Sequence, residues 1–540
     1  MNRLLWTGVL GCVISVQLLG QHQYLRLNQL NETRYGGLIY SDSAHTHSSV
    51  RPWDLWEIDS IRYRNVRQAD AAILPQRSWF NRKLFHEHLV QIYHEDYALI
   101  IDPVVNFQGG YDPQYPGDEV LFVNTRGFNL EGRIGKRFTF QTSYLENQGR
   151  FPQYVADFEE DHLVIPGQGY ARDFRETAFD YGMAAGQISY SPGRFFSFTL
   201  GQGRNFFGEG YRSMMLSDVA FNYPFFRIET EFWKIKYVNL WAQLYDVRRE
   251  AEVNGVFAKK YLSSHYLSIN IGQRWNLSFF EAIVFGDTAQ QRGIDAAFFN
   301  PVIFYRPLEF AVGSRGSNAL LGTGVSYRIM NGMQAYGQFV LDEFNLDAFL
   351  NESGSWLNKY SWQLGWKYYD AFGVSGLFTR LEYNASRPFT YSHREPISNF
   401  GHYGQPLAHP WGANFHELLL HGLWQKGRWE FDLRYHFGLM GLDFDSTNYG
   451  ADIYRSYNEN RVSDNNNQVA QGATSTYHFV HARIAWVVNP ASGLKLEAGA
   501  RWRSLAADNS RTDFTPINTG MSNYYYLGLR TEFFNNYYDF

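Results

Sequence analysis

The chain of 540 residues has a single cysteine, Cys12, and after its first 20 positions it has no long uninterrupted apolar run. Cys12 lies in the expected leader, so the mature chain would have no thiol, which suits an oxidising compartment. A membrane-spanning helix needs about 20 consecutive apolar residues, and none is predicted here. If the mature chain is integral to a membrane, it must therefore cross it as a closed barrel.

A strong excess of charge is also lacking, since the formal net charge is only −5. No basic stripe is present to contact phosphates, so no nucleic-acid partner is expected. The glycines from Gly201 to Gly210 do not make a nucleotide-binding loop, because no strand-to-helix context follows them and no Lys-Ser/Thr pair ends the run. No GxSxG motif occurs and nothing orders a Ser-His-Asp triad, so an outer-membrane hydrolase is the weaker alternative. We predict no enzyme and no cofactor.

Aromatic residues, in contrast, are abundant. They make up 18% of the chain, with 44 Phe, 38 Tyr and 15 Trp, yet the mean hydropathy stays polar at −0.38. Apolar residues that are strictly interleaved with polar ones produce this combination. It is typical of transmembrane β-barrels, in which lipid-facing and lumen-facing residues alternate and aromatic girdles lie at both membrane interfaces.

The first 20 residues have the features of a signal peptide for export. Arg3 provides a basic start, residues 4–19 are largely apolar, and cleavage is expected between Gly20 and Gln21. A lipoprotein signal ending at Cys12 is disfavoured, because the apolar run before it is too short for export.

Residues 21–97 lack strand periodicity and are predicted to form a small, partly helical periplasmic segment. Helices are expected over 26–35 and over 79–93, the second with Ser78 as N-cap. Its three histidines, His86, His88 and His94, have spacings that could converge on a metal ion. No cysteine or carboxylate completes a recognisable ligand set, so we interpret them as polar residues on the solvated side of the helix and predict no metal site.

From Ala98 onward, the chain alternates between apolar and polar residues with the period of a β-strand. In 430–439, for example, Phe431 and Leu433 oppose Glu430 and Asp432, and similar patterns occur in 128–134, 236–244, 377–384 and 494–503. The polar face carries both signs of charge, as expected of a wet barrel interior. The pattern predicts 18 strands beginning near Ala98, Phe122, Arg137, Gly182, Arg194, Phe225, Ile235, Lys260, Arg274, Asn318, Met333, Lys359, Gly376, Asn414, Arg428, Thr476, Gly493 and Tyr524.

The connections between these strands alternate between short turns and long segments, such as 148–181, 203–224, 287–317, 386–413 and 441–475. Outer-membrane barrels have short periplasmic turns and long extracellular loops. A soluble propeller or solenoid would show a fixed sequence repeat, which is absent. We therefore predict an all-β fold, a transmembrane antiparallel barrel of about 18 strands over 98–540. Because the number of strands is even, both termini of the barrel chain are expected to face the periplasm. The alternating aromatic stretch 525–540 is predicted to end the last strand at Phe540, where the barrel assembly machinery would read it.

The distinctive motifs fall in three long loops, at 203–218, 295–310 and 391–414. There, aromatic residues are interleaved with Arg, Glu, Asn and Gln, a combination that suits carbohydrate, because sugar rings stack on aromatic faces and their hydroxyls need planar partners. The candidate polysaccharide-binding residues are Asn205, Phe206, Phe207, Glu209, Tyr211, Arg212, Tyr403, Gln405, His409 and Trp411. The alternative is that these side chains only pack the loops together and into the lumen.

The same three loops carry a family resemblance. The sequences NFFGEGYRSMMLSD at 205–218, FFNPVIFYRPLEF at 298–310 and HYGQPLAHPWGANF at 402–415 together resemble the Wzi-like capsule assembly family, and look closest to its Bacteroidetes branch, labelled gliding motility protein RemB. The resemblance covers most of the barrel. It implies an 18-stranded outer-membrane barrel, a helical periplasmic part, loops that close the pore, and a lectin that organises capsular polysaccharide.

Three hypotheses about function follow from these observations. The first is a non-enzymatic barrel that binds or organises surface polysaccharide, with outer-membrane lipid as its surroundings and a link to gliding motility. The second is a diffusion channel, because a barrel of this size is wide enough for an aqueous pore. The third is an accessory component of gliding or secretion machinery. The sugar, the protein partners and the oligomeric state are not determined by the sequence.

Overall fold

The computed structural model describes residues 24–41, 46–55, 78–252, 254–286, 293, 296–302, 305, 307, 316–507 and 519–540. The signal peptide expected at 1–20, and with it Cys12, lies outside these residues. No helix in the described ranges is both long and apolar enough to span a membrane.

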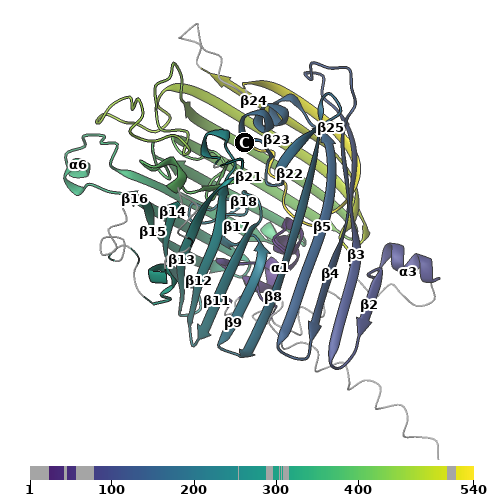
Figure 1. Cartoon of the computed structure of the whole chain (residues 1–540). Helices are drawn as coiled ribbons and strands as arrows, with labels where there is room; N and C mark the ends of the chain where they lie inside the picture. The colour runs from purple at the N-terminus through teal and green to yellow at the C-terminus, as the bar shows by residue number, and fades with distance from the viewer. Residues whose placement is uncertain are drawn as a thin grey trace, which may run out of the picture.

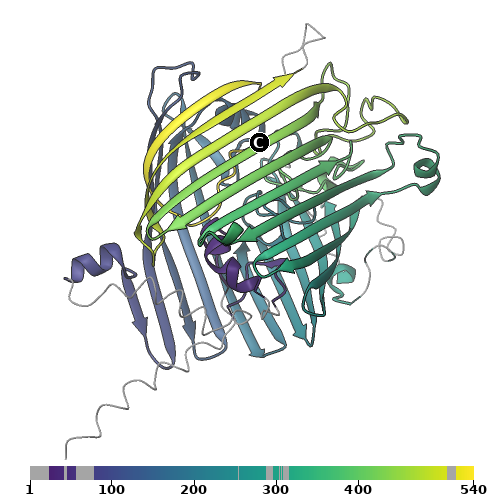
Figure 2. The same cartoon turned by 180° about the vertical axis from the view of Figure 1, so that it is seen from behind.

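Eighteen antiparallel strands close into one barrel, which confirms the predicted fold class (Figures 1 and 2). Each expected strand is present, and the largest differences in starting position are Gly182 against Ala178 and Tyr524 against Gly520. The wall consists of β3 (Tyr97–Tyr111), β4 (Leu121–Ile134), β5 (Phe138–Arg150), β8 (Ala178–Gly193), β9 (Phe196–Gly203), β11 (Tyr223–Phe232), β12 (Ile235–Asp246), β13 (Ala258–Ile271), β14 (Trp275–Gly286), β15 (Ser317–Met330), β16 (Met333–Glu343), β17 (Lys359–Tyr369), β18 (Leu377–Ser386), β21 (Phe415–Lys426), β22 (Trp429–Leu442), β23 (Ala473–Asn489), β24 (Leu494–Ala507) and β25 (Gly520–Thr531).

The barrel closes between its first and last strands, β3 and β25, whose register runs from Tyr525↔Tyr111 to Arg530↔Asn106. Nearer the start of β3, before the residues that pair with β25, a short strand, β2 (Val90–Tyr93), pairs with residues 98–101. Strand β2 follows helix α3 (Trp79–Phe85), which begins at the predicted N-cap: the side chain of Ser78 accepts a hydrogen bond from the amide of Asn81. The region expected to be one helix over 79–93 therefore consists of helix α3, a short connection and strand β2.

The interpretation of the histidines as solvated residues of one helix is wrong. His86 and His88 lie after the end of α3 and are buried, and only His94 is exposed. Nδ1 of His88 lies 2.5 Å from a carboxylate oxygen of Asp102, and Nδ1 of His86 accepts from Arg428. These contacts fasten the β2 segment to the wall and to the short turn after β21.

Alternation correctly predicts which residues share a face, but it does not always tell which face points inward. In β22, Phe431 and Leu433 are exposed on the outside while Glu430 and Asp432 are buried inside, as expected. In β12 the arrangement is reversed. Val238, Leu240, Ala242 and Leu244 point into the lumen, where they belong to the main hydrophobic core. The lumen at this flank is dry, because other parts of the chain fill it.

Four segments enter the lumen and together form what we call the plug. They are the N-terminal segment, described over 24–41 and 46–55, with α1 (Gln29–Ile39) and β1 (Val50–Arg51); the inward loop 204–222 with β10 (Phe206–Phe207); the connection 387–414 with β19 (Gly401–His402) and β20 (Gln405–Pro406); and the tail 532–540. Figure 1 shows the purple α1 and the marked C-terminus inside the ring of strands. The helix expected over 26–35 is confirmed as α1, displaced toward the C-terminus.

The long connections lie at the end of the barrel opposite to the short turns, and helices α4 and α6 belong to two of them. Helix α4 (Gln153–His162), with β6 (Val164–Ile165) and β7 (Gly169–Phe174), follows β5, and helix α6 (Leu346–Leu350) follows β16. In Figure 1, α4 lies over the mouth of the barrel and α6 extends to its side. We call the connections 151–177, 344–358 and 443–472 the cover.

The tail is not part of the last strand, as the sequence had suggested. Strand β25 ends at Thr531, and Phe540 packs against Tyr154 and Phe158 of α4. A stretch of nine extended residues spans about 30 Å, enough to cross the apolar height of a barrel wall of about 25 Å. The tail therefore runs from the short-turn end to the cover.

Candidate functional site

The inward loop 204–222 brings six of the ten candidate residues into the plug, where all six are buried. Phe206 and Phe207 form β10, which pairs with β1 of the N-terminal segment in the register Val50↔Phe207 and Arg51↔Phe206. This two-stranded sheet lies inside the barrel. It explains why the alternation of β9 stops at Gly203: the next residues pair with another plug segment instead of the wall.

Glu209 is the centre of a first polar cluster, which joins three elements. Its carboxylate accepts hydrogen bonds from Ser48 (2.5 Å), from Tyr40 (2.8 Å) and from Nζ of Lys367 in β17 (2.8 Å). Arg51 lies alongside, donates to the carbonyl of Gly210 (2.6 Å) and stacks its guanidinium on Phe206 at 3.8 Å. The N-terminal segment is thus tied to both the inward loop and the wall.

Arg212 is the centre of a second polar cluster, deeper in the plug. Its Nη2 lies 3.4 Å from Glu417 of β21 and 3.3 Å from Asp539 of the tail. The carboxylate of Glu417 also accepts from His409 Nε2 (2.7 Å) and His436 Nδ1 (2.9 Å). The side chains of Arg212, Glu417 and His409 are fully buried. A charge taken out of water is tolerated only when it is paired and hydrogen-bonded, so these contacts depend on each other.

Neighbouring groups complete this second cluster. The hydroxyl of Tyr211 donates to Asp539 (2.7 Å), and Glu382 of β18 accepts the backbone amides of Tyr211 (2.8 Å) and Arg212 (3.1 Å). Gly210 must lack a side chain, because a Cβ atom here would collide with the carboxylate of Glu382. This close approach holds the loop against the wall.

The remaining four candidates lie in the connection 387–414. His409 is in the second cluster, and Trp411 packs edge-on against Tyr477 of β23 with ring centroids 4.9 Å apart. Gln405 accepts the amide of Gly167 in the cover at 3.0 Å. Tyr403 packs against Phe221, and it is the one candidate that keeps partial exposure. In the inward loop, the side chain of Asn205 accepts a hydrogen bond from Arg227 of β11 at 2.7 Å.

The structure therefore brings the candidates together as the packed interior of the plug. The sequence missed their main partners, Lys367, Glu382, Glu417 and His436, which occupy inward positions of wall strands. Their signal was present, because each is a charged or titratable residue on the polar face of an alternating strand. It could not be distinguished from the polar faces expected to line a water-filled lumen.

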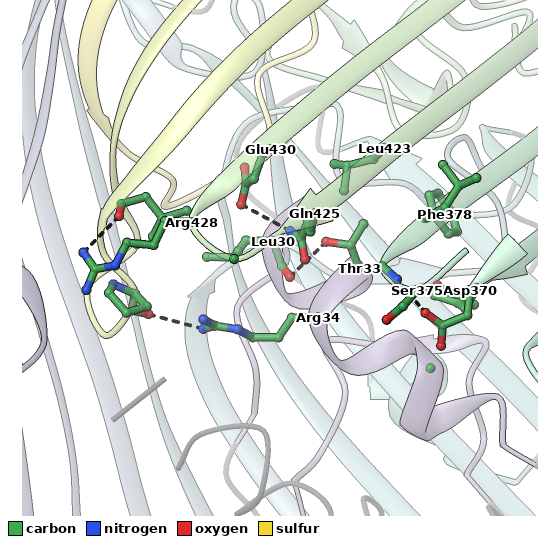
Figure 3. A pocket seen from close by; sticks show the side chains of 18 of the residues that line it. Leu30, Thr33, Arg34, Asp370, Ser375, Phe378, Leu423, Gln425, Arg428 and Glu430 are labelled. Carbon is green, nitrogen blue, oxygen red and sulfur yellow. Dashed lines mark hydrogen bonds between the residues drawn. The ribbon is translucent and has the colours of Figure 1, made fainter. Parts of the chain in front are cut away.

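A cavity of about 670 Å³ opens at the short-turn end of the barrel, between α1 and three of the short turns (Figure 3). Its polar groups are largely engaged with the protein itself. Arg34 donates to the carbonyl of Pro490, Arg428 to that of Val488, and Gln425 to the carboxylate of Glu430. None of the ten candidate residues lines it, and its contacts serve to join α1 to the rim of the barrel.

Helix α4, which belongs to the cover, has a buried titratable residue, Glu159. Burial, and then the negative charges of Asp173 and Glu160, raise the pKa of Glu159 from an ordinary value of 4.5 to about 7. Between pH 4.5 and pH 7, the folded state therefore binds more protons than the unfolded state. The stabilisation that comes from protonated Glu159 is complete below pH 4.5 and is lost as the pH rises through 7.

We therefore expect α4 to be better protected against amide hydrogen exchange at pH 6 than at pH 8, after correction for the intrinsic exchange rate. Glu159→Gln should remove most of this difference, whereas Glu176→Gln, at an exposed carboxylate after β7, should retain it. Equal protection of wild-type α4 at both pH values would contradict the assignment.

No protein-family model matches the chain, and no curated protein matches it. Among solved structures, it is similar to Wzi of Escherichia coli, an outer-membrane protein described as involved in group 1 capsule assembly and as a carbohydrate-binding β-barrel. The two share 11% sequence identity over 94% of this chain and 99% of that one, with a TM-score of 0.53. The chain has the fold of Wzi.

Two further similar structures have lower TM-scores. The outer-membrane protein OprD of Pseudomonas aeruginosa has 12% identity and a TM-score of 0.42, over 84% of this chain and 99% of its own. OccAB2 of Acinetobacter baumannii has 12% identity and a TM-score of 0.42, over 80% and 96%. At these identities the comparison with Wzi establishes a shared barrel fold, which matches Gram-negative outer-membrane proteins.

Proposed function

We propose that this chain is an exported, non-enzymatic barrel of the Gram-negative outer membrane that binds or organises surface polysaccharide. The observation that carries the proposal is the filled lumen: four segments meet in it, and buried ion pairs hold them to the wall. Such an interior suits a scaffold for an outward-facing surface. The fold of Wzi, which is described as carbohydrate-binding, supports the same function.

The polysaccharide would contact the outer surface of the cover, while the ten buried candidates hold that surface in place. Trp356, which is partly exposed, packs at a tilt against Tyr457 (ring centroids 4.8 Å apart), and the guanidinium of Arg461 lies 4.0 Å from the Trp356 centroid. Exposed amide side chains follow Tyr457 in the connection 443–472, at Asn458, Asn460, Asn465 and Asn466. A flat aromatic face beside amides provides both the stacking and the planar hydrogen-bonding partners that sugars need.

We expect Trp356→Ala to weaken the retention of surface polysaccharide and binding on a glycan array, because the aromatic face is lost. A loss of about 1 to 2 kcal/mol, or roughly tenfold in affinity, is the scale for one aromatic contact. Phe349→Ala, at an exposed aromatic residue of α6 in the same connection, is the matched control. Unchanged binding by a correctly assembled Trp356→Ala barrel would contradict the proposed surface.

The second candidate function is a diffusion channel, for which the 18-stranded wall is wide enough. A steady, large conductance of the wild-type protein in planar bilayers would favour it over the scaffold. A role in gliding or secretion machinery remains the third proposal, and the proteins that copurify with the chain are the measurement that bears on it. Insertion by the barrel assembly machinery is proposed for all three functions.

A further inference from the structure

Three polar side chains lie in register on the outer face of the wall: Asn239 of β12, His265 of β13 and Glu281 of β14. Their outward direction follows from their neighbours, since Leu240 and Tyr266, one position further along their strands, belong to the core in the lumen. A ring nitrogen of His265 lies 3.9 Å from the carboxylate of Glu281. We call these three residues the polar row.

The polar row lies near the middle of the membrane-spanning height. Trp275, which is half exposed, marks the short-turn end of β14, and Glu281 follows six residues later in the strand. At the rise of a tilted strand this places Glu281 about 15 Å above the interface, within an apolar band about 25 Å tall. Hydrocarbon offers no hydrogen bonds, so polar side chains at this depth are costly unless something covers them.

Residues 296–302 of the connection after β14 provide that cover, which we call the strap. Asn239 donates to the carbonyl of Pro301 (3.0 Å), and Trp241 donates to that of Phe298 (2.9 Å). Further along the connection, the ring of Tyr305 lies on His265 with centroids 4.2 Å apart. As a result, Asn239, His265 and Glu281 are only 3%, 6% and 5% exposed.

The other side of the strap has exposed apolar groups. Val302 is 80% exposed and Phe299 is 43% exposed, although one edge of Phe299 also contacts Trp241 of the wall (ring centroids 5.8 Å apart). The exposed side chain of Asn300 accepts the amide of Val302. The strap thus directs the carbonyl groups of Phe298 and Pro301 toward the wall and leaves Val302 and part of Phe299 toward the surroundings. This is the arrangement that lipid chains favour, because the backbone hydrogen bonds are satisfied on the protein side.

We propose that residues 296–302 are an intramembrane strap: an extracellular connection that descends outside the barrel, seats on the polar row and presents Val302 and Phe299 to lipid. The inference concerns the outer wall, so it does not depend on what the cover binds. It also gives a role to the sequence FFNPVIFYRPLEF, whose described residues lie outside the lumen and not in the plug.

The test combines a change in the strap with a change in the wall of the full-length protein. Replacing residues 298–302 with a Gly-Ser linker of equal length exposes the polar row to lipid, and should lower the midpoint of thermal unfolding in vesicles by several degrees. In a wall with Asn239→Leu, His265→Leu and Glu281→Leu, the same linker should cause little loss. No loss in the native wall, or an equal loss in both walls, would overturn the proposal.

A second measurement reports on lipid contact directly. The mature chain would have no cysteine, so Val302→Cys would give one reactive site. In sealed vesicles it should react slowly with a membrane-impermeant maleimide, whereas Asn466→Cys in the cover should react fast. Fast reaction of Val302→Cys would overturn the proposal, and so would its efficient disulfide formation with a second copy, because the flank would then be a protein interface.

Discussion

Glu417→Ala is expected to loosen the plug and to make the barrel conduct. The substitution leaves Arg212 buried beside Asp539 alone, and it removes the acceptor that His409 and His436 share. Breaking a buried ion pair by removing one partner costs about 3 to 5 kcal/mol. The variant should therefore unfold at a lower temperature, and planar bilayers should show current steps that the wild type lacks.

The comparison with three further variants separates charge from packing. Glu417→Gln keeps hydrogen-bonding capacity and should have an intermediate effect. The double variant Glu417→Ala with Arg212→Met removes both charges and should recover much of the stability, because an apolar pair needs no solvation. Glu395→Ala, at an exposed carboxylate of the connection 387–414, is the control and should behave as the wild type. If Glu417→Ala is as stable and as silent as the wild type, the second cluster does not hold the plug.

Removal of residues 533–540 is expected to have the other large effect. The tail buries Tyr537 and Tyr538, and it supplies the Asp539 carboxylate to Arg212 and Tyr211. Truncation of one buried aromatic residue costs roughly 3 to 5 kcal/mol where the site cannot collapse. The shortened barrel should have a continuous opening beside the inward loop, seen as conductance, and a mobile α4, seen as faster hydrogen exchange.

The truncated variant keeps Glu532, which forms an ion pair with Lys495 of β24, so that the end of β25 stays attached to its neighbour in the wall. Heat-modifiable migration in detergent gels should show that the shortened chain still assembles. Phe540→Ala removes the ring that contacts Tyr154 and Phe158 but keeps the rest of the tail, and should loosen α4 without opening the lumen. A silent barrel after truncation would mean that the other three plug segments close the lumen by themselves.

The wall was predictable because alternation is a local property. The pattern of 430–439, for example, needs only neighbours in sequence to specify a two-faced strand, and β22 has that form. The burial of the candidate residues was not predictable, since it arises from pairings across the chain. Arg212 meets Glu417 and Asp539, and Glu209 meets Lys367. No spacing between such residues carries this information.

Two errors have the same physical origin. Strand β12 was given an apolar outer face, and the tail was given the role of a strand, because both patterns fit an empty barrel surrounded by lipid. A filled lumen also provides an apolar environment, so Leu240 can point inward and Tyr538 can leave the wall. The alternation shows that one face of a strand is apolar. It does not distinguish whether lipid or the filled lumen contacts that face.

The position of the tail has a consequence for the order in which the protein can be built. Tyr154 of α4 donates to the carbonyl of Tyr538, a partner 384 residues further along the chain, and Arg503 of the wall donates to the carbonyl of Phe540. Helix α4 precedes most of the wall in sequence, yet the residues that support it follow β25. Closure of the ring and ordering of its outer surface are therefore coupled, and the surface that would meet polysaccharide is completed only after Tyr538 and Phe540 have reached the cover.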